Sequence, residues 1–495
     1  MILNSNPTSN FTPNTAQIKT KADSPFILKI ASPLLWTLHL GTLALLVYFL
    51  MYTPQWNWNN IFSINGFTLV LWSTVTFFSA LVSTYAKNYL NGFRYHQRFT
   101  FLSLGFTLSV MLFVMSNHLA ALLISWFFMG VFMARLIGVD AKWGEAREAS
   151  KLAQKFFLSG TLVLSFGLLL LAYETDQYTL SGILDKLQVI PDFMLLIASL
   201  LLIVAAIIQS AIYPFHRWLL SAMTAPTPAS ALMHAGFVNG SGILLALVSA
   251  VLVASNSLTL LFIIGGFTAV IAQFTKLLQV NVKQKLACST IAQMGFMIMQ
   301  CGLGFFNAAI AHLILHGFYK AYLFLSSGEE IAHSAPKKPL KIKIKPVQAL
   351  VVLVFGMAGA LLFAVLTGKT TMVDSSVFLT LIVAITVGQA TYNIVKEKSL
   401  TTVQKIVVPI LLFITGISLY ALLYNGVTAL MVAMPMSNVP QTLSVIQVVF
   451  GLMFLLGFFV MKLGVYRKVP WLYVKLLNLS QPDTHTILKY KSLNS

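Results

Sequence analysis

Charged side chains are scarce in this sequence of 495 residues. Only 9% of the residues are Asp, Glu, Lys or Arg, whereas 58% are hydrophobic. Soluble domains carry about 25% charged residues, so a soluble fold of this length is not expected. The mean hydropathy of +0.83 agrees with that exclusion. The composition therefore predicts a protein that lies within a lipid bilayer.

Acidic residues are rarer than basic ones, with 13 Asp and Glu against 32 Lys and Arg and a net charge of +19. In a soluble protein this excess would indicate a nucleic-acid partner. Here the basic residues lie in short loops between apolar runs, and aromatic residues are not interleaved with them. We interpret the charge as setting membrane topology and contacting anionic lipid headgroups, and we expect no nucleic-acid partner.

Cysteine and cofactor motifs are also nearly absent. The two cysteines, Cys288 and Cys301, lie beside or within apolar runs, with no CxxC or other metal-ligand neighbour. Both are expected to be reduced packing residues. No GxGxxG or Walker motif opens a helix, and no nucleophile–base set is present. The sequence therefore predicts no cofactor, no metal site and no enzymatic active site in this chain.

Long apolar runs dominate the sequence. Because about 20 apolar residues cross one bilayer, the runs predict an all-α membrane protein of about fourteen spans. They lie at about 26–52, 66–88, 99–116, 118–138, 153–173, 192–212, 228–253, 257–279, 286–304, 306–326, 346–367, 376–395, 405–424 and 441–464. Residues 1–24 form a polar segment without the pattern of a signal sequence, residues 25–465 the transmembrane domain, and residues 466–495 a C-terminal tail.

Charge alternates between successive loops. When each loop is numbered by the span that it follows, the odd-numbered loops are nearly uncharged or acidic, as at Glu174 and Asp185. By the positive-inside rule, the even-numbered loops and both termini are cytoplasmic, in a multi-pass inner-membrane protein. The basic residues of the even-numbered loops are Lys87, Arg94 and Arg98; Lys142, Arg147, Lys151 and Lys155; Arg217; Lys283 and Lys285; Lys337, Lys338, Lys341, Lys343 and Lys345; and Lys396, Lys398 and Lys405.

Three prolines interrupt the middle of the chain. Pro214 lies in the stretch 210–219, and Pro226 and Pro228 lie in the stretch 225–235. Proline removes a backbone donor, and broken helices at membrane depth mark ion or substrate sites in transporters. A broken helix is one interpretation. An ordinary interfacial loop, with proline in the first turn of the next helix, is the other.

A second cluster lies inside an apolar span. His312, His316 and Lys320 are spaced i, i+4 and i+8 and therefore share one helix face. A charged lysine at the bilayer centre costs about 2.5–3.5 kcal/mol, and histidine titrates near neutrality. The pattern indicates a proton pathway. Half of a zinc site, or a packed polar cluster without transport, are the alternatives.

Two further titratable residues are candidates for the same pathway. His234 follows Pro228 by six residues, and an isolated buried histidine is more often a satisfied core residue. Lys369 lies in a polar interruption of the second half, which is either a second broken helix or, as we slightly favour, an extracytoplasmic loop. Because each lies next to a possible break in a helix, both remain candidates for the proton pathway.

These stretches resemble the antiporter-like family, the large membrane subunits of respiratory complex I, such as NuoL, and of Mrp antiporters. Residues 65–69 and 89–92 resemble the opening helices, and residues 225–234 resemble Gly-Pro-Thr-Pro-x-Ser-Ala-Leu-x-His. Residues 281–295 resemble Asp-x-Lys-x-x-x-Ala-Tyr-Ser-Thr-x-x-Gln-x-Gly, and a His-x3-Lys pair falls on His316 and Lys320. The resemblance implies two inverted five-helix repeats with broken helices, and a proton pathway through His234, His312, His316 and Lys320.

The sequence departs from that family at two charged positions. Phe127 stands where the family has an essential glutamate, and Gln209 stands where it has a lysine. These departures, with residues 215–218 and 234–240, resemble the membrane subunit of the DAB inorganic-carbon accumulation complex. That resemblance implies a partner, a large zinc protein related to β-carbonic anhydrases, whose CO2 hydration is driven by cation flow through the membrane subunit.

Three hypotheses follow for the function. The leading one is a proton-translocating subunit that energises a carbonic-anhydrase-like partner. The second is a subunit of a complex I-like or Mrp-type antiporter, against which the missing Glu–Lys pair argues. The third is a passive membrane anchor for a peripheral protein, since Phe127 and Gln209 carry no charge.

Overall fold

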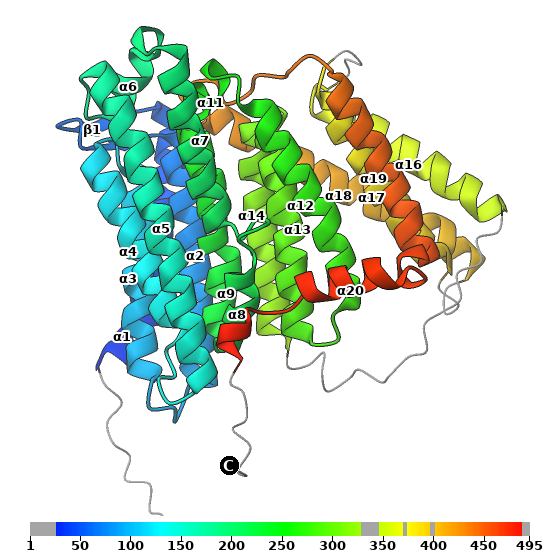
Figure 1. The fold of residues 1–495 in the computed structure, drawn as a ribbon, viewed down its shortest axis with the longest axis horizontal. Helices are drawn as coiled ribbons and strands as arrows, with labels where there is room; N and C mark the ends of the chain where they lie inside the picture. The colour runs from blue at the N-terminus through cyan, green and yellow to red at the C-terminus, as the bar shows by residue number, and fades with distance from the viewer. Residues whose placement is uncertain (1–25, 328–345, 370–373, 397–400, 488–495) are drawn as a thin grey trace, which may run out of the picture.

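The computed structural model describes residues 26–327, 346–369, 374–396 and 401–487 (Figure 1). The predicted N-terminal segment 1–24 and the basic loop from Lys337 to Lys345 lie outside these residues. The described chain is almost wholly helical, as the apolar runs predict.

The first half begins with α1, a short hairpin of β1 and β2, and a series of long helices. Asn59 and Asn60 turn the hairpin with positive φ angles, which asparagine tolerates better than most residues. The elements are α1 (Phe26–Tyr52), β1 (Trp56–Trp58), β2 (Phe62–Ile64), α2 (Gly66–Tyr89), α3 (His96–Met115), α4 (Leu119–Ile137), α5 (Gly144–Thr175), α6 (Leu180–Asp185), η1 (Leu187–Val189) and α7 (Asp192–Gln209).

The middle of the chain consists of short helical pieces, and long helices resume after it. The short pieces are α8 (Arg217–Ser221), η2 (Ala222–Thr224), α9 (Thr227–Ala235), η3 (Phe237–Asn239), α10 (Gly240–Leu247) and α11 (Ser249–Ala254). The remainder are α12 (Leu258–Leu278), α13 (Val282–Gly302), α14 (Phe306–Leu325), α16 (Pro346–Leu366), α17 (Ser376–Lys396), α18 (Thr402–Leu430), α19 (Val445–Leu463), η4 (Val465–Arg467), α20 (Pro470–Leu479) and η5 (Thr484–Thr486).

Within the described residues, ten helical segments are long and apolar enough to cross a membrane. Three more helices, α16, α17 and α19, carry shorter apolar stretches, and α13 is 21 residues long. The structure thus confirms an all-α membrane architecture. The count of about fourteen spans remains a prediction for these last four helices.

Burial differs sharply between the spans. In the most apolar window of Thr227–Leu247, 94% of the residues are buried inside the protein, against 17% in the window of α1. A segment so enclosed by protein can tolerate irregular backbone that lipid would not allow. The α9–α10 segment is therefore the centre of the bundle, and α1 is peripheral.

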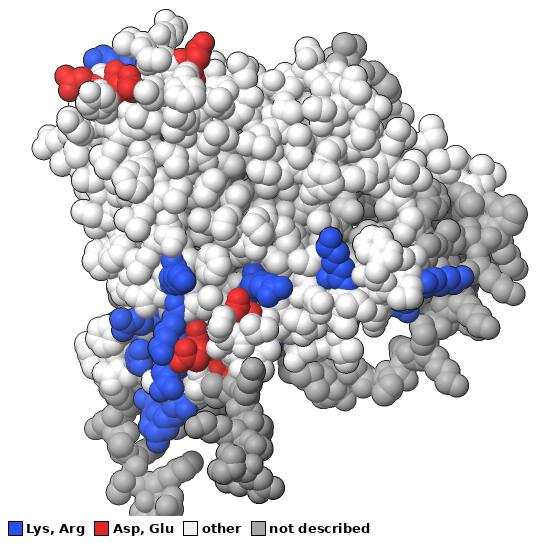
Figure 2. Space-filling model, in the orientation of Figure 1, with Lys and Arg blue, Asp and Glu red and all other residues white. Residues whose placement is uncertain are grey.

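The basic loops lie at one end of the bundle, which we call the basic end. Figure 2 shows most Lys and Arg side chains toward the lower end of the molecule and a group of Asp and Glu at the upper end. The loops α2–α3 and α4–α5 belong to the basic end, and the segment from α5 to α7 turns at the opposite end (Figure 1). This is the arrangement that the alternation of charge predicts.

Two interruptions of regular helix lie against each other in the core. The first separates α7 from α8, beginning with Ser210, Ala211 and Ile212, which are fully buried, and ending at Pro214 and His216. The second lies at Gly236–Asn239, between α9 and α10. Pro214 thus lies in an interruption, as the broken-helix interpretation requires.

The other two prolines have a different place. Pro226 immediately precedes α9, and Pro228 lies in its first turn. This is the position where proline is tolerated, because the first turn has no internal acceptor for its missing N–H. The loop interpretation therefore holds for Pro226 and Pro228, and the interruption at Gly236 was not predicted.

Side chains at the first interruption satisfy backbone carbonyls of the second. Gln209 Nε2 donates to the carbonyl of Phe237 at 3.4 Å. The Ser210 hydroxyl lies within hydrogen-bonding range of the Val238 carbonyl and the Ser241 hydroxyl. Carbonyls freed from a helix inside a bilayer require such partners. Neutral Gln209 therefore has a structural role where the family resemblance implies a charged lysine.

The C-terminal segment packs onto the basic end. Helix α20 lies against α12, and η5 lies against α5 (Figure 1). The Leu479 carbonyl contacts His216 Nε2 at 2.8 Å, and the Ser480 carbonyl accepts from Gln279 at 2.7 Å. The predicted tail, at least through residue 487, is therefore attached to the bundle by specific contacts.

Acid is expected to release this C-terminal segment. Burial lowers the pKa of His216 from 6.5 to about 4, and the positive charge of Arg217 adds to this effect. The attached form thus disfavours the proton, so attachment is fully stabilised above about pH 6.5 and weakens as the pH falls. At pH 5 the loss is on the order of 2 kcal/mol.

Hydrogen exchange of residues 470–487 at pH 7.5 and pH 5, corrected for the intrinsic rate, measures this release. His216→Gln keeps a side-chain donor for the Leu479 carbonyl but does not titrate. We expect protection to fall with acid in the wild type and to change little in the variant. Equal behaviour of the two proteins would contradict the role of His216.

Candidate ion pathway

Helix α14 carries the central polar residues of the bundle. His312, His316 and Lys320 share one face of this apolar helix, as their spacing predicts. Lys320 is fully buried and His316 is 5% exposed, while His312 is partly buried. At 1.5 Å per residue, His312 and Lys320 lie about 12 Å apart along the helix. The face therefore forms a polar stripe along much of the bundle core.

Lys320 has a backbone carbonyl as its partner. Its Nζ donates to the carbonyl oxygen of Leu286 on α13 at 3.0 Å. Among the described residues, no carboxylate lies within ion-pair distance of this amine. A buried amine held by a neutral acceptor can lose its proton without leaving an unpaired carboxylate behind. Lys320 is therefore suited to releasing and regaining a proton.

His234 joins the same hydrogen-bonded group from α9. It is fully buried, its ring stacks on Phe324 at a centroid distance of 4.3 Å, and Nδ1 lies 2.9 Å from Thr290 Oγ1. Thr290 donates its own proton to the Leu286 carbonyl at 3.1 Å. The threonine oxygen therefore accepts from Nδ1–H of His234, which leaves Nε2 unprotonated in the neutral ring.

Several buried ring nitrogens have no protein partner. They are Nε2 of His234, Nε2 of His312 and both ring nitrogens of His316. The rings of His312 and His316 lie nearly parallel with centroids 6.1 Å apart. Buried polar atoms are normally paired with protein or ordered water. Unpaired imidazole nitrogens in succession therefore provide sites that can take up and pass on protons.

Lys369 lies toward the opposite end of the bundle. It follows α16 in the connection to α17, as the loop interpretation predicts, but it is only 7% exposed. Its Nζ lies 3.8 Å from the ring centroid of Phe305 and 4.9 Å from that of Tyr424. Aromatic faces attract a desolvated cation. The loop therefore holds a buried amine next to aromatic rings.

Polar residues of α14 and α18 form a second group next to Lys369. Asn307 Nδ2 lies 3.1 Å from the Tyr424 hydroxyl and 2.8 Å from Thr428 Oγ1, and Tyr420 contacts Gln300. This group was not predicted from the sequence. Tyr420, Tyr424 and Thr428 repeat the i, i+4, i+8 spacing of the α14 stripe, so the same search applied to polar uncharged residues would have found them.

The structure brings together only part of the predicted set. His234, His312, His316 and Lys320 surround one region, and Lys369 lies beyond it on the side of Phe305. Phe127 is 37% exposed on the outer side of α4. Over the described ranges, no group of three or more His, Cys, Asp or Glu residues is arranged to hold a metal. The clustered residues thus form one buried polar group.

The known proteins that resemble this chain include membrane subunits of transporters and of NADH:quinone oxidoreductase. The family model described as NADH:quinone oxidoreductase/Mrp antiporter, TM, matches residues 116–395. A probable inorganic carbon transporter subunit DabB from Bacillus subtilis is 35% identical over 51% of this chain and 50% of its own length. The NADH-quinone oxidoreductase subunit L of Rickettsia typhi is 34% identical over 56% of this chain and 43% of its own.

Similarity of fold extends further than similarity of sequence. The structure of the Mrp complex from Dietzia sp. DQ12-45-1b contains a chain that matches 92% of this one, with 57% of its own length covered. The TM-score is 0.61 at 21% sequence identity. The chain spans about half the length of the curated relatives it matches.

Proposed function

Because the chain belongs to the NADH:quinone oxidoreductase/Mrp antiporter family of transmembrane subunits, we propose that it carries protons across the membrane through the residues described above. One observation carries the proposal. A bundle with very few charged residues encloses His234, His316 and Lys320 almost completely, within electrostatic range of one another. Placing ionisable groups in a bilayer is costly, so they mark ion pathways by default.

The proposed route uses each group as a donor or an acceptor. A proton reaching His234 at Nε2 makes the ring cationic, and its charge lowers the affinity of neighbouring Lys320 for a proton. Lys320 then passes its proton to His316, whose two ring nitrogens are free of protein partners. His312 takes it onward toward Lys369, past the polar residues of α18. Lys320, now neutral, takes up the proton from His234 Nε2, and both groups return to their starting states.

The energy available is adequate for such a carrier. One elementary charge that crosses 100 mV of membrane potential yields about 2.3 kcal/mol. We propose that the basic end faces the cytoplasm, since the positive-inside rule assigns Lys- and Arg-rich loops to that side. The membrane would then be the bacterial inner membrane, with both chain termini in the cytoplasm.

We propose further that the chain is the membrane subunit of an inorganic-carbon transport complex. Relatives named as probable DabB subunits support this, at 35% identity in Bacillus subtilis and 31% in Hydrogenovibrio crunogenus. The ion gradient would be coupled to a large zinc-containing partner related to β-carbonic anhydrases, and the zinc would belong to that partner. The complex I-like or Mrp-type antiporter remains the second candidate, because subunit L relatives and the Mrp fold match support it.

Purification from the native membrane separates the two candidates. A tagged chain is isolated in mild detergent, and mass spectrometry and zinc analysis identify what accompanies it. A stoichiometric, zinc-containing, carbonic-anhydrase-like protein is expected. Several other antiporter-like membrane subunits, without a zinc protein, would favour the antiporter candidate.

Replacement of Lys369 with methionine is expected to slow proton flux at least tenfold. The change removes the buried amine and preserves the length of the side chain, so that protons lose a buried titratable site on that side. Flux is measured with a pH-sensitive dye in proteoliposomes that contain the purified complex. Lys186→Met is the control, because Lys186 lies at the same end and donates only to the Thr175 carbonyl. Wild-type flux in Lys369→Met would remove Lys369 from the route.

A further inference from the structure

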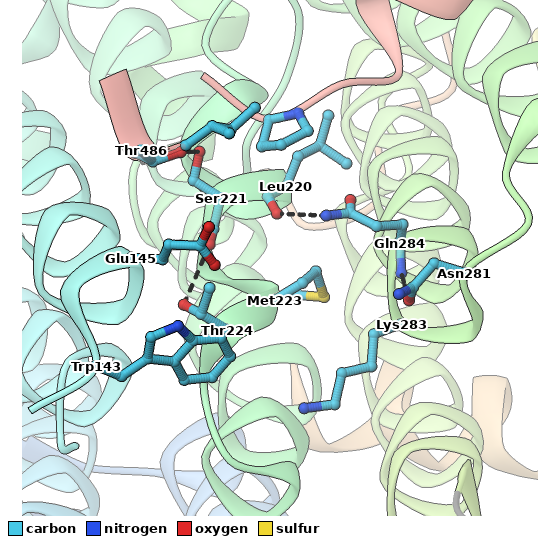
Figure 3. Close-up of a pocket in the computed structure, with 12 residues that line it drawn as sticks. Trp143, Glu145, Leu220, Ser221, Met223, Thr224, Asn281, Lys283, Gln284 and Thr486 are labelled. Carbon is cyan, nitrogen blue, oxygen red and sulfur yellow. Dashed lines mark hydrogen bonds between the residues drawn. The ribbon is translucent and has the colours of Figure 1, made fainter. Parts of the chain in front are cut away.

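A pocket of about 230 Å³, lined by both polar and apolar residues, lies at the basic end. Figure 3 shows its walls. Trp143 and Glu145 come from the start of α5, Ser221 and Thr224 from α8 and η2, and Lys283 from α13. Pro482, Thr486 and Ile487 of the C-terminal segment complete the wall. The pocket is thus built from four parts of the chain that are distant in sequence.

The pocket contains one acidic and one basic side chain that do not pair with each other. Lys283 Nζ donates to the Ala225 carbonyl at 2.7 Å, directly before the start of α9. Glu145 is partly buried, and Figure 3 shows its carboxylate on the side of Ser221 and Thr224. Other acids nearby on α5 differ in this respect, since Glu148 pairs with Lys151 at 2.8 Å and with Arg147 at 3.6 Å. Glu145 is therefore an acid available to the pocket.

One face of α13 connects this pocket to the buried residues. Lys283, Leu286 and Thr290 follow one another at helical spacing, and they contact Ala225, Lys320 and His234 respectively. Seven residues of α-helix span about 10 Å, so Thr290 lies roughly that far above the pocket along the helix. Lys283 also lies within electrostatic range of His234. A short polar face thus leads from the pocket to the first histidine of the route.

We propose that this pocket is the mouth of the proton route and that Glu145 exchanges protons between water and His234. The proposal rests on the proposed function. A carboxylate binds a proton from water and passes it to a neighbouring acceptor, with no net change in its own charge after each transfer. Glu145 thereby supplies the acidic group that the chain lacks at Phe127.

The C-terminal segment forms one side of this mouth. The Asp483 amide and the Thr486 hydroxyl both bond the hydroxyl of Ser221, each at 3.0 Å. Both contacts are single hydrogen bonds to one side chain, whereas the walls from α5 and α13 belong to long packed helices. Attachment of residues 482–487 therefore sets how wide the mouth is.

Chemical rescue tests the proposal. Proton flux into proteoliposomes with the purified complex is compared for wild type, Glu145→Gln and Glu148→Gln. Glu148 lies one helical turn further along α5 with its own basic partners, so it is a matched control. We expect Glu145→Gln to lose at least tenfold in flux and to regain most of it in millimolar azide, a small diffusible acid. Glu148→Gln is expected to behave as wild type.

A second measurement locates the mouth independently of Glu145. Thr224→Cys places a thiol in the pocket wall, and the native Cys288 and Cys301 are 1% and 0% exposed. A membrane-impermeant cationic thiosulfonate is expected to block flux when it is added on the basic side only. Lys151→Cys, outside the pocket, is the control for labelling without block.

The outcomes separate this inference from the proposed function. Flux that does not depend on Lys320 would overturn both. Flux that depends on Lys320 but is unchanged in Glu145→Gln, or lost there without rescue by azide, would overturn the inference alone. Labelled Thr224→Cys with normal flux would overturn it as well.

Discussion

Lys320→Met is expected to abolish proton flux and to leave the protein as stable as the wild type. Lys320 lies between His234 and His316 in the proposed route, and it is the only amine among the central residues. Methionine has similar length and no ionisable group. Because every proton passes this position, we expect a loss of at least a hundredfold, measured by dye quenching in proteoliposomes of the purified complex.

The structure explains why stability should survive this change. The Leu286 carbonyl keeps the hydroxyl of Thr290 as a donor when the amine is gone. Replacing a buried polar group with an apolar one of similar volume is often neutral or stabilising, provided that its partner stays satisfied. The melting temperature in detergent should therefore be equal to or above that of the wild type.

Lys285→Met is the matched control for Lys320→Met. It removes the same charge from an exposed position on α13. Its flux should equal that of the wild type. Normal flux in Lys320→Met would refute the route. Normal function in a variant that lacks His312, His316 and Lys320 together would favour the passive-anchor hypothesis.

Gly302→Ala is expected to prevent the protein from accumulating in a folded form. Helices α12 and α13 approach each other closely through Gly265, Gly295 and Gly302. A Cβ at Gly302 would lie 2.2 Å from the backbone nitrogen of Phe262, and one at Gly295 would lie 2.7 Å from that of Ala269. Backbone atoms cannot change rotamer to relieve a clash with the added Cβ, so helices α12 and α13 must move apart.

The expected cost exceeds that of ordinary overpacking, which is about 1–3 kcal/mol. Yield of monodisperse protein and the melting temperature measure it. Gly416→Ala is the control, because a Cβ there meets nothing within 4 Å and alanine favours the helix by about 1 kcal/mol. A normal melting temperature for Gly302→Ala would show that the α12–α13 contact can relax.

The spans and the central polar face could be predicted from the sequence because both depend on local pattern. The apolar run at 26–52 coincides with α1, and the run at 306–326 differs from α14 by one residue. The spacing of His312, His316 and Lys320 places them on one face wherever the helix packs. Such features need only hydrophobicity and the helical period.

Features that depend on partners from elsewhere in the chain escaped prediction. The interruption at Gly236 follows no proline and exists because Gln209 and Ser210 supply donors to Phe237 and Val238. The Leu286 carbonyl, which holds Lys320, belongs to the backbone and has no side-chain signature. The inverted repeats and the roles of the pathway residues remain predictions, since they concern evolution and transport.

The C-terminal segment also joins two halves of the bundle mechanically. It contacts α12 through α20, the α12–α13 connection through Gln279, and α5 and Ser221 beyond them. Transporters that work by rocking one helical half against the other need these halves to move as separate bodies. Because the C-terminal segment contacts both halves at one end, it restricts their relative motion there. Any switching of access in this protein should therefore occur through side chains, over distances of a few ångströms, within a frame that stays still.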